Sequence, residues 1–305
     1  MNRWLFLTGI LALVLAGSRP LAAQGPNRDR AAEEFEAKLG YQTGTVTLGG
    51  GMATLRLPAS FRFLGPEGAR RLLTEGWDNP PDSAHRVLGM MIPAGTSPLA
   101  PEGWGIVIHY EEDGFVKDHD AASIDYAKML KEMQDSTAAA NEERQEDGFE
   151  PVTLVGWAEP PHYDSAAHKL YWAKELAFGS EAAHTLNYNI RILGRRGVLV
   201  LNAVAGMEQL PVIRSQTGAV LSAVEFNEGH RYTDYLPGKD KAAAYGLTGL
   251  IVGATAAKAG FFKVLIAGIL AAKKAIMVGL VALGAALKRF LGRGPKPAET
   301  STETP

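Results

Sequence analysis

One short stretch of the chain holds three polar residues that are candidates for chemistry. His162, Asp164 and His168 follow Pro160 and Pro161. Two imidazoles and a carboxylate can hold a metal ion, or they can activate a nearby serine as a nucleophile. Their spacing has no helical regularity, and no third histidine lies beside them. The sequence therefore favours a proline-rich bend in which Asp164 caps a turn.

Two further clusters carry charge. Carboxylates crowd residues 111–120, where Glu111 to Asp113 precede Asp118, His119 and Asp120. Such a run can bind Ca²⁺, but it lacks the ligand register and central glycine of a known calcium loop. We expect a solvated loop in which Asp118 or Asp120 caps the following helix. Arg195 and Arg196 can meet a phosphate or carboxylate, although arginines at a hairpin tip are common.

The composition excludes several classes of site. The chain has 305 residues and no cysteine, so thiol nucleophiles, iron–sulfur clusters and cysteine-based zinc sites are ruled out. No GxSxG, HExxH, Walker A or GxGxxG motif is present. We therefore predict no catalytic, cofactor-binding or metal site, with His162, Asp164 and His168 as weak candidates only. The alternative is an enzyme whose site combines distant residues such as His109 with these three.

The elements that position these side chains indicate an α+β fold. Residues 45–48 and 54–57 alternate on both sides of three glycines, which predicts a hairpin. Further strands are expected at 86–92, 105–110, 152–157, 168–177, 185–193 and 198–201. A short helix is expected over 66–76, an amphipathic helix over 120–147 and a closing helix over 210–224. We predict one domain over residues 24–240, with a largely antiparallel sheet and helices packed against it.

The two ends of the chain predict export and anchoring. Residues 1–23 combine a basic start, an apolar run and Ala22–Ala23, which is typical of a cleaved signal peptide; an uncleaved anchor is the alternative. Residues 242–262 carry Lys258 as their single charge and are long enough to cross a bilayer as a C-terminal transmembrane helix. This span predicts the lipid bilayer as a partner, and its small residues permit a homo-oligomer.

The segment after the span is expected to be cytoplasmic. Residues 263–305 contain Lys273 and Lys274 in mid-run, so they predict a continued or interfacial helix and then a disordered tail. Seven Lys/Arg follow Phe262. The positive-inside rule therefore predicts a single-pass inner-membrane protein with a periplasmic domain and a cytoplasmic C-terminus.

The order of several motifs resembles a known bacterial family. These are Val155-Gly156-Trp157, Pro160 to Asp164, His168 to Ala173, Leu186-Asn187-Tyr188, Leu193 to Leu199, Arg231 to Asp234 and Lys241 to Leu247. Gly103 to Gly105 and Gly114 to Ala121 fit as well, except that His119 stands where an acidic residue is expected. The chain resembles the family called domain of unknown function 2167, described as predicted membrane-anchored proteins. The resemblance implies a signal peptide, an exported domain and an anchor, and it implies no activity.

The leading hypothesis is a non-enzymatic membrane-anchored module that binds another envelope protein or a small envelope ligand. Residues 24–240 carry 20 Lys/Arg against 31 Asp/Glu, a net charge of −11. An acidic domain is a poor binder of nucleic acid. A third hypothesis is a lipid-responsive element built on residues 264–287.

Overall fold

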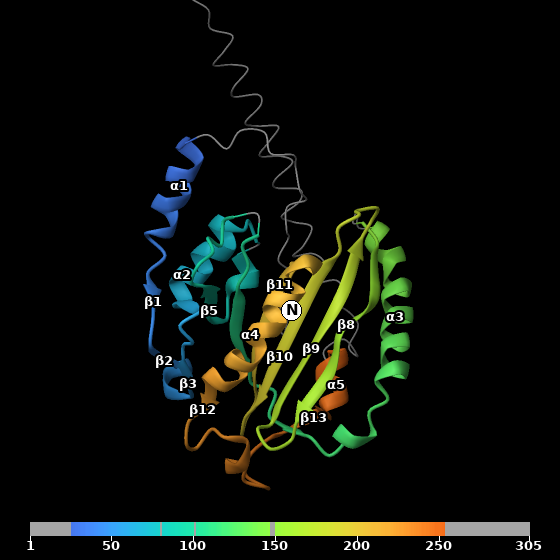
Figure 1. The fold of residues 1–305 in the computed structure, drawn as a ribbon. Helices are drawn as coiled ribbons and strands as arrows, with labels where there is room; N and C mark the ends of the chain where they lie inside the picture. Colours follow the sequence, from blue (N-terminus) through green and yellow to red (C-terminus); the bar gives the residue numbers. More distant parts are fainter. Residues whose placement is uncertain (1–25, 80, 101, 147–149, 254–305) are drawn as a thin grey trace, which may run out of the picture.

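The fold is built on one large sheet. The structure, a computed structural model, describes residues 26–79, 81–100, 102–146 and 150–253 (Figure 1). Eight strands form the sheet, and each neighbouring pair is antiparallel. In spatial order they are β1 (Tyr41–Gln42), β4 (Phe61–Leu64), β5 (Val87–Pro93), β6 (Ile106–Glu111), β11 (Val198–Gly206), β10 (Thr185–Leu193), β9 (Lys169–Phe178) and β8 (Val152–Asp164). The predicted α+β class with a largely antiparallel sheet is confirmed.

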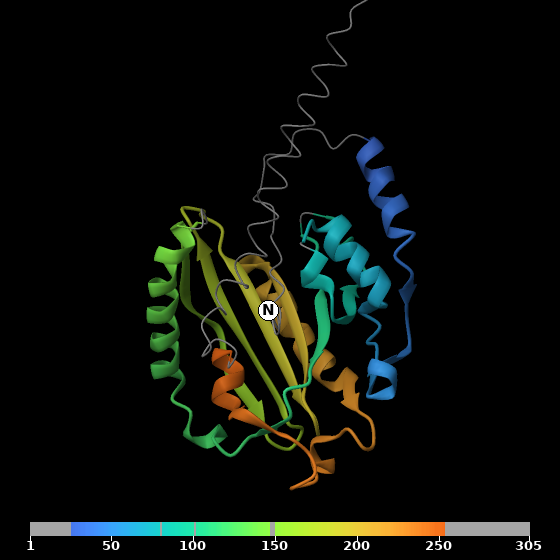
Figure 2. The same cartoon turned by 180° about the vertical axis from the view of Figure 1, so that it is seen from behind.

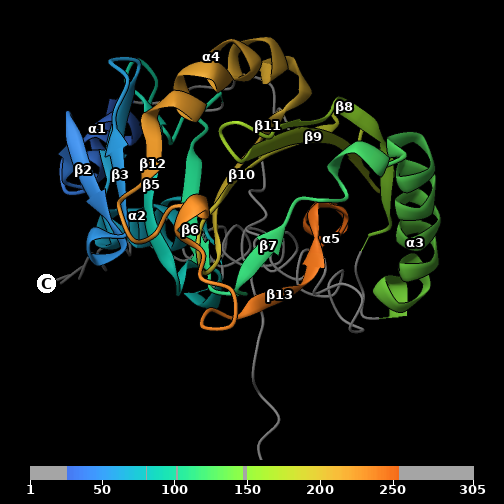
Figure 3. The ribbon, with the colours of Figure 1, turned by 90° about the horizontal axis from the view of Figure 1, so that it is seen from below.

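Helices cover both faces of this sheet (Figure 3). On one face lie α4 (Leu210–Ala223) and a small sheet of β12 (Val224–Phe226), β3 (Ala53–Arg56) and β2 (Thr45–Leu48). On the other face α3 (Tyr126–Glu146) and α5 (Leu247–Val252) pack over β8 to β10. Also on that face, α2 (Pro66–Arg71) packs near β5, and α1 (Pro26–Glu36) lies outside it (Figure 2). Each face thus has its own apolar core.

Short helical turns join these elements. They are Gly49–Gly51, Leu72–Gly76, Pro81–Ala84, Ala121–Ser123, Met207–Gln209 and Tyr232–Asp234. The Leu72–Gly76 turn is a π-helix that continues α2, so the single helix expected over 66–76 changes its hydrogen-bond pattern at Leu72.

Strand alternation decides which side chains reach which core. Leu186, Tyr188 and Ile190 of β10 enter the core under α4, and the residues between them face the opposite side. A bulge between Val87 and Gly89 interrupts the β5–β6 pairing. Gly89 has φ +151°, and a Cβ there would lie 2.1 Å from Phe63 Cζ. Only glycine fits this position.

The caps of α3 and α5 differ from the expectation. The long helix begins at Tyr126 rather than near residue 120, and Asp125 Oδ1 accepts hydrogen bonds from the amides of Ala127 and Lys128. Asp120 instead accepts hydrogen bonds from the first two amides of α5, at 3.1 and 3.0 Å. Sequence spacing indicates a cap only beside its own helix, whereas Asp120 and the start of α5 are brought together by the fold.

The start of the predicted transmembrane helix is corrected. Ala242–Gly246 form strand β13, which pairs in parallel with β7 (Phe115–Lys117). Leu247, Leu250 and Ile251 of α5 are buried against the sheet, and Gly253 takes a left-handed conformation. Apolar side chains suit a protein core as well as a bilayer, so composition alone did not separate the two. The small residues of the predicted span include Gly246, Gly249 and Gly253; the first ends β13, the second lies in α5 and the third follows it, so they do not line one continuous helix.

Other predicted segments lie outside the described residues: the signal peptide, residues 254–262 of the predicted span and the basic tail. In the described ranges, no helix combines the length and the apolar character that a membrane crossing requires.

Candidate functional site

A groove of about 470 Å³ opens at the end of the large sheet, where the β8–β9 turn meets the segment after β12. Its charged lining consists of Arg56, Lys169, Arg231 and Glu225, with His168 beside them. Glu225 Oε2 lies 2.9 Å from Arg56 Nη1, which lowers the pKa of Glu225. The groove is therefore basic in a domain whose net charge is acidic.

Lys169 is committed to the protein itself. Its ammonium donates hydrogen bonds to the carbonyls of Leu221 (2.5 Å) and Val224 (3.1 Å) at the end of α4. A cation at a helix C-terminus satisfies carbonyls that lack intrahelical partners. Arg231 is exposed, and its guanidinium is the charge that the groove offers most freely.

His168 lies on the groove wall in a hydrogen-bonded cluster. Its Nδ1 is 3.3 Å from the Tyr163 hydroxyl and 3.6 Å from Asp118 Oδ2, and the Tyr163 hydroxyl donates to Asp118 over 2.7 Å. The Tyr163 hydroxyl has one hydrogen and donates it in the hydrogen bond to Asp118. Nδ1 of His168 must therefore be the donor to the Tyr163 oxygen. The Tyr232 ring stacks on the imidazole with centroids 4.0 Å apart.

This cluster positions His168 rather than activating a nucleophile. Burial, together with the hydrogen bond to Asp118, raises the pKa of Tyr163, so the phenol stays neutral. Burial favours the neutral form of Asp118, but hydrogen bonds to its carboxylate, chiefly that from Tyr163, outweigh burial and lower the pKa of Asp118. His168 also has φ +52°, a strained value for a residue other than glycine. The cluster thus holds together β7, the β8–β9 turn and the Tyr232–Asp234 turn.

The other sequence candidates lie apart from His168. Asp164 Oδ1 accepts the amides of Ala166 (2.9 Å) and Ala167 (3.0 Å), which is the turn cap expected for it. His162 contacts Tyr171 on the α4 side of β8, with ring centroids 5.1 Å apart. His109 is on β6, facing the other side of the sheet, where its Nε2 is 3.6 Å from Glu111 Oε1. The fold does not bring these histidines together.

The acidic cluster is divided among separate partners. Asp113 accepts the Tyr245 hydroxyl, Asp118 accepts Tyr163 and Asp120 caps α5. Across residues 26–253, wherever placement is described, no three histidine or carboxylate side chains are grouped to hold a metal ion.

Arg195 forms a bidentate ion pair with Asp240, at 2.7 and 3.1 Å. The hydrogen bond from Arg195 holds the pKa of Asp240 down at about 2. Arg195 therefore ties residue 240 to the β10–β11 turn rather than offering a free phosphate site.

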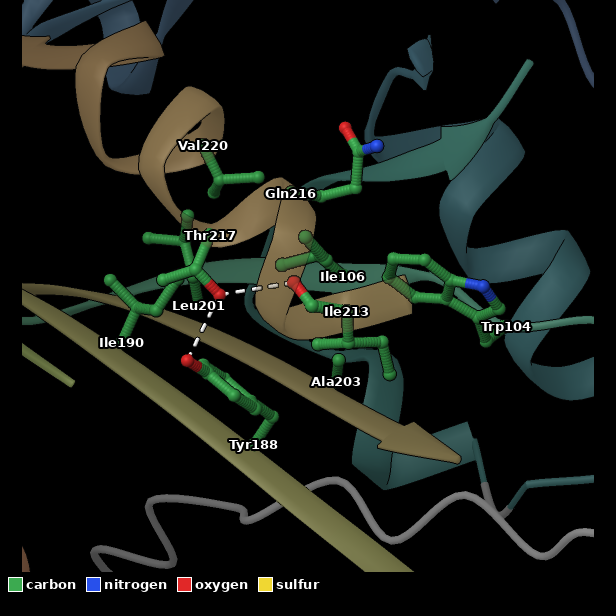
Figure 4. A pocket seen from close by; sticks show the side chains of 10 residues that line it. All are labelled: Trp104, Ile106, Tyr188, Ile190, Leu201, Ala203, Ile213, Gln216, Thr217 and Val220. Carbon is green, nitrogen blue, oxygen red and sulfur yellow. Dashed lines mark hydrogen bonds between the residues drawn. The ribbon is translucent and has the colours of Figure 1, made fainter. Parts of the chain in front are cut away.

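A second, smaller cavity lies under α4 (Figure 4). Its volume is about 10 Å³, and its lining is apolar apart from Tyr188, Thr217, Gln216 and the Trp104 indole nitrogen. Thr217 Oγ1 lies 2.9 Å from the Tyr188 hydroxyl. This space suits one water molecule and no larger ligand.

A buried polar array lies on β9, β10 and β11, and the local sequence pattern does not indicate its burial. Asn187, Asn189 and Arg191 alternate with apolar residues, which predicts that they face solvent. They are instead 2–5% exposed. One signal in the sequence could have marked them. The strand that carries these alternating polar residues is followed directly by the apolar run of β11, and such a run indicates a strand at the centre of a sheet.

Comparison with solved structures finds distant likenesses. Cyanobacterial PsbP from Synechocystis sp. PCC 6803 matches with a TM-score of 0.34 and 8% identity over 68% of this chain and 100% of that chain. A point mutant of the protein Mog1 matches with a TM-score of 0.32 and 10% identity, over 61% of this chain and 95% of that chain. LpqN, involved in cell envelope biogenesis of Mycobacterium tuberculosis, matches with a TM-score of 0.29 and 16% identity, over 64% of this chain and 96% of that chain.

No curated protein matches this sequence. The model of one protein family, described as a protein of unknown function, does match it, over residues 40–284. This match spans the groove, the large sheet and the segment after α5. The chain therefore belongs to the DUF2167 family of proteins of unknown function.

Proposed function

We propose that this protein is a non-enzymatic binding module of the bacterial envelope, anchored in the inner membrane with its domain in the periplasm. Its groove beside His168 takes an acidic segment of another envelope protein. The observation that carries this proposal is the groove of about 470 Å³, whose arginines and lysine face a single carboxylate, Glu225, already paired with Arg56.

The charge around the groove favours selectivity. The domain carries −11 over residues 24–240, so most of its surface repels acidic partners. A local basic groove on such a surface fixes where and in which orientation an acidic segment binds. His168 and Tyr232 add a ring pair at the groove wall, held in place by the Asp118 cluster.

The proposed anchor lies after Gly253. Residues 242–252 belong to β13 and α5, so they are already used in the fold. The apolar sequence from Ala254 to Leu287 is interrupted by four lysines and is followed by further basic residues. This bias supports a cytoplasmic C-terminus.

Membrane extraction tests the anchor. We expect the full-length protein to stay in the membrane pellet after alkaline carbonate treatment, and a chain ending at Gly253 to leave it. Full-length protein found in the soluble fraction would contradict the anchor.

Site-specific crosslinking tests the groove. A photoreactive residue at Thr233, on the groove wall, is expected to crosslink an envelope protein in cells, and mass spectrometry is expected to map the crosslink to an acidic segment. Arg231→Glu should abolish this crosslink because it reverses the charge that the groove offers most freely.

Matched controls separate binding in the groove from non-specific crosslinking. A photoreactive residue at Lys128 on α3 should give no such product, and Arg70→Glu on α2 should leave the Thr233 crosslink intact. Crosslinks that survive Arg231→Glu, or that map to segments without acidic residues, would refute the groove as the binding site.

A further inference from the structure

A row of buried polar side chains crosses the centre of the large sheet, on the face opposite α4. In cross-strand register, Lys174 of β9 lies beside Asn187 of β10, and Trp172 lies beside Asn189, which in turn lies beside Asn202 of β11. Arg191 follows two residues along β10. We call these six residues the donor array: Trp172, Lys174, Asn187, Asn189, Arg191 and Asn202. Each is between 1% and 7% exposed.

The side-chain oxygens of the donor array are used within it. Arg191 Nη1 donates to Asn202 Oδ1 at 2.9 Å, and Arg191 Nη2 lies 3.5 Å from Asn189 Oδ1. Asn189 Nδ2 donates to Asn187 Oδ1 at 2.9 Å. A guanidinium can only donate, so the amide oxygens of Asn189 and Asn202 must point toward Arg191. That orientation fixes the amide nitrogen of Asn202 on the other side.

What remains in the array is an excess of donors. Asn202 Nδ2 and Trp172 Nε1 are buried with no hydrogen-bond partner among the residues that the structure describes. Lys174 forms no ion pair or hydrogen bond with any residue in the described ranges, although its side chain is over nine-tenths buried. The two buried donors, Asn202 Nδ2 and Trp172 Nε1, carry a desolvation cost unless an acceptor meets them.

The charges on this face point the same way. Burial lowers the pKa of Arg191, and the negative charge of Glu111 partly offsets this effect. Glu111 Oε1 is also 3.6 Å from His109 Nε2. No carboxylate in the described part of the chain pairs with Lys174, and burial together with Arg191 lowers the pKa of Lys174 to about 8. The array therefore presents an indole N–H and an amide N–H that have no acceptor among the described residues, beside the cations Arg191 and Lys174.

We propose that the donor array is a binding site for a small ligand that presents an oxyanion, either a carboxylate or a phosphate. The oxyanion accepts hydrogen bonds from Asn202 Nδ2 and Trp172 Nε1 and compensates the charge of Lys174. This site is separate from the groove beside His168, and it does not depend on the proposed protein partner. Since the array is buried, the ligand enters through local opening, and its association is slow.

Thermal unfolding of the full-length protein in a mild detergent tests this site. The probes are inorganic phosphate, acetate and dihexanoyl phosphatidate, each titrated at constant ionic strength. At about 100 times its dissociation constant, a bound probe should raise the unfolding midpoint by about 5 °C, in a saturable manner. A response to acetate assigns a carboxylate, a response to phosphate a free phosphate, and a response to the lipid alone a headgroup.

Two array variants and two controls decide the outcome. Lys174→Met and Asn202→Asp should each abolish the saturable response, by removing the cation or replacing a donor with a carboxylate. Lys128→Met on α3 and Arg231→Glu in the groove should retain it. The absence of a saturable response to all three probes would overturn the proposal. So would a response that persists in both array variants, because phosphate also stabilises proteins without a specific site.

Discussion

Replacing Lys174 with methionine is expected to stabilise the ligand-free protein. Lys174 is 7% exposed, and burial lowers its pKa from 10.5 to about 8. Each pKa unit corresponds to about 1.4 kcal/mol, so holding the ammonium in the fold at neutral pH costs about 3 kcal/mol. Methionine has a similar length and no charge, so it removes this cost and retains most of the packing.

Thermal unfolding of the full-length protein in detergent, followed by near-UV circular dichroism, measures the effect. A gain of about 3 kcal/mol raises the midpoint by about 6 °C or more in a domain of this size. Lys128→Met on exposed α3 is the matched control, and its midpoint should change by less than about 2 °C. A lower midpoint for Lys174→Met would refute the reasoning, because it would show that Lys174 has a stabilising partner in the ligand-free fold.

The dependence on pH gives an independent check. The folded pKa of Lys174 is about 8 and the unfolded pKa about 10.5, so between these values the unfolded chain binds the proton that the folded chain has lost. This group therefore contributes a rise in stability as the pH increases above about 8, and no slope below it. The comparison should stop near pH 9.5, because deprotonation of tyrosines such as Tyr245, whose pKa burial raises, acts in the opposite direction. Equal slopes in wild type and Lys174→Met would contradict the assignment.

Three further predictions concern the scaffold, each measured by urea denaturation of the full-length protein. Gly89→Ala should destabilise it by about 3 kcal/mol, because the new Cβ would lie 2.1 Å from Phe63 Cζ; an unchanged midpoint would show that the bulge relaxes freely. Asp120→Ala should cost about 1 kcal/mol by uncapping α5. Burial would raise the pKa of Asp120, but the α5 hydrogen bonds lower it, so the Asp120 cap stabilises the fold above about pH 4. The wild type should lose this stability at lower pH, and the variant should not show that loss. Tyr163→Phe should cost about 1.5 kcal/mol by removing the hydrogen bond to Asp118, and a cost near zero would show that the cluster does not stabilise the fold.

Local pattern was a good guide to the elements themselves. The strand expected over 185–193 and the hairpin arm over 45–48 occupy those residues in the structure. The closing helix expected over 210–224 ends one residue earlier. These elements follow from periodicity, because side chains two apart in a strand, or three and four apart in a helix, share a face whatever the rest of the chain does.

The same pattern was misleading where it suits two different environments. Leu247 and Ile251 sit in an apolar run that suits a bilayer and a protein core equally, and the fold uses them in the core. Asn187 and Asn189 alternate like the polar face of a half-exposed strand, yet the sheet has helices on both faces and buries them. In each case the deciding neighbour lies far away in the sequence.

The sequence by itself determined the absence of thiol chemistry, the α+β class, the family and most of the strand positions, because these depend on composition and short-range spacing. Only the tertiary structure decided that Asp120 caps a helix 127 residues away, that His109 and His162 face opposite sides of the sheet, and that Lys174 is buried with no described carboxylate paired to it. The physical reason is that a hydrogen bond or a desolvation cost depends on which atoms are adjacent in space, and antiparallel pairing of distant strands sets that adjacency.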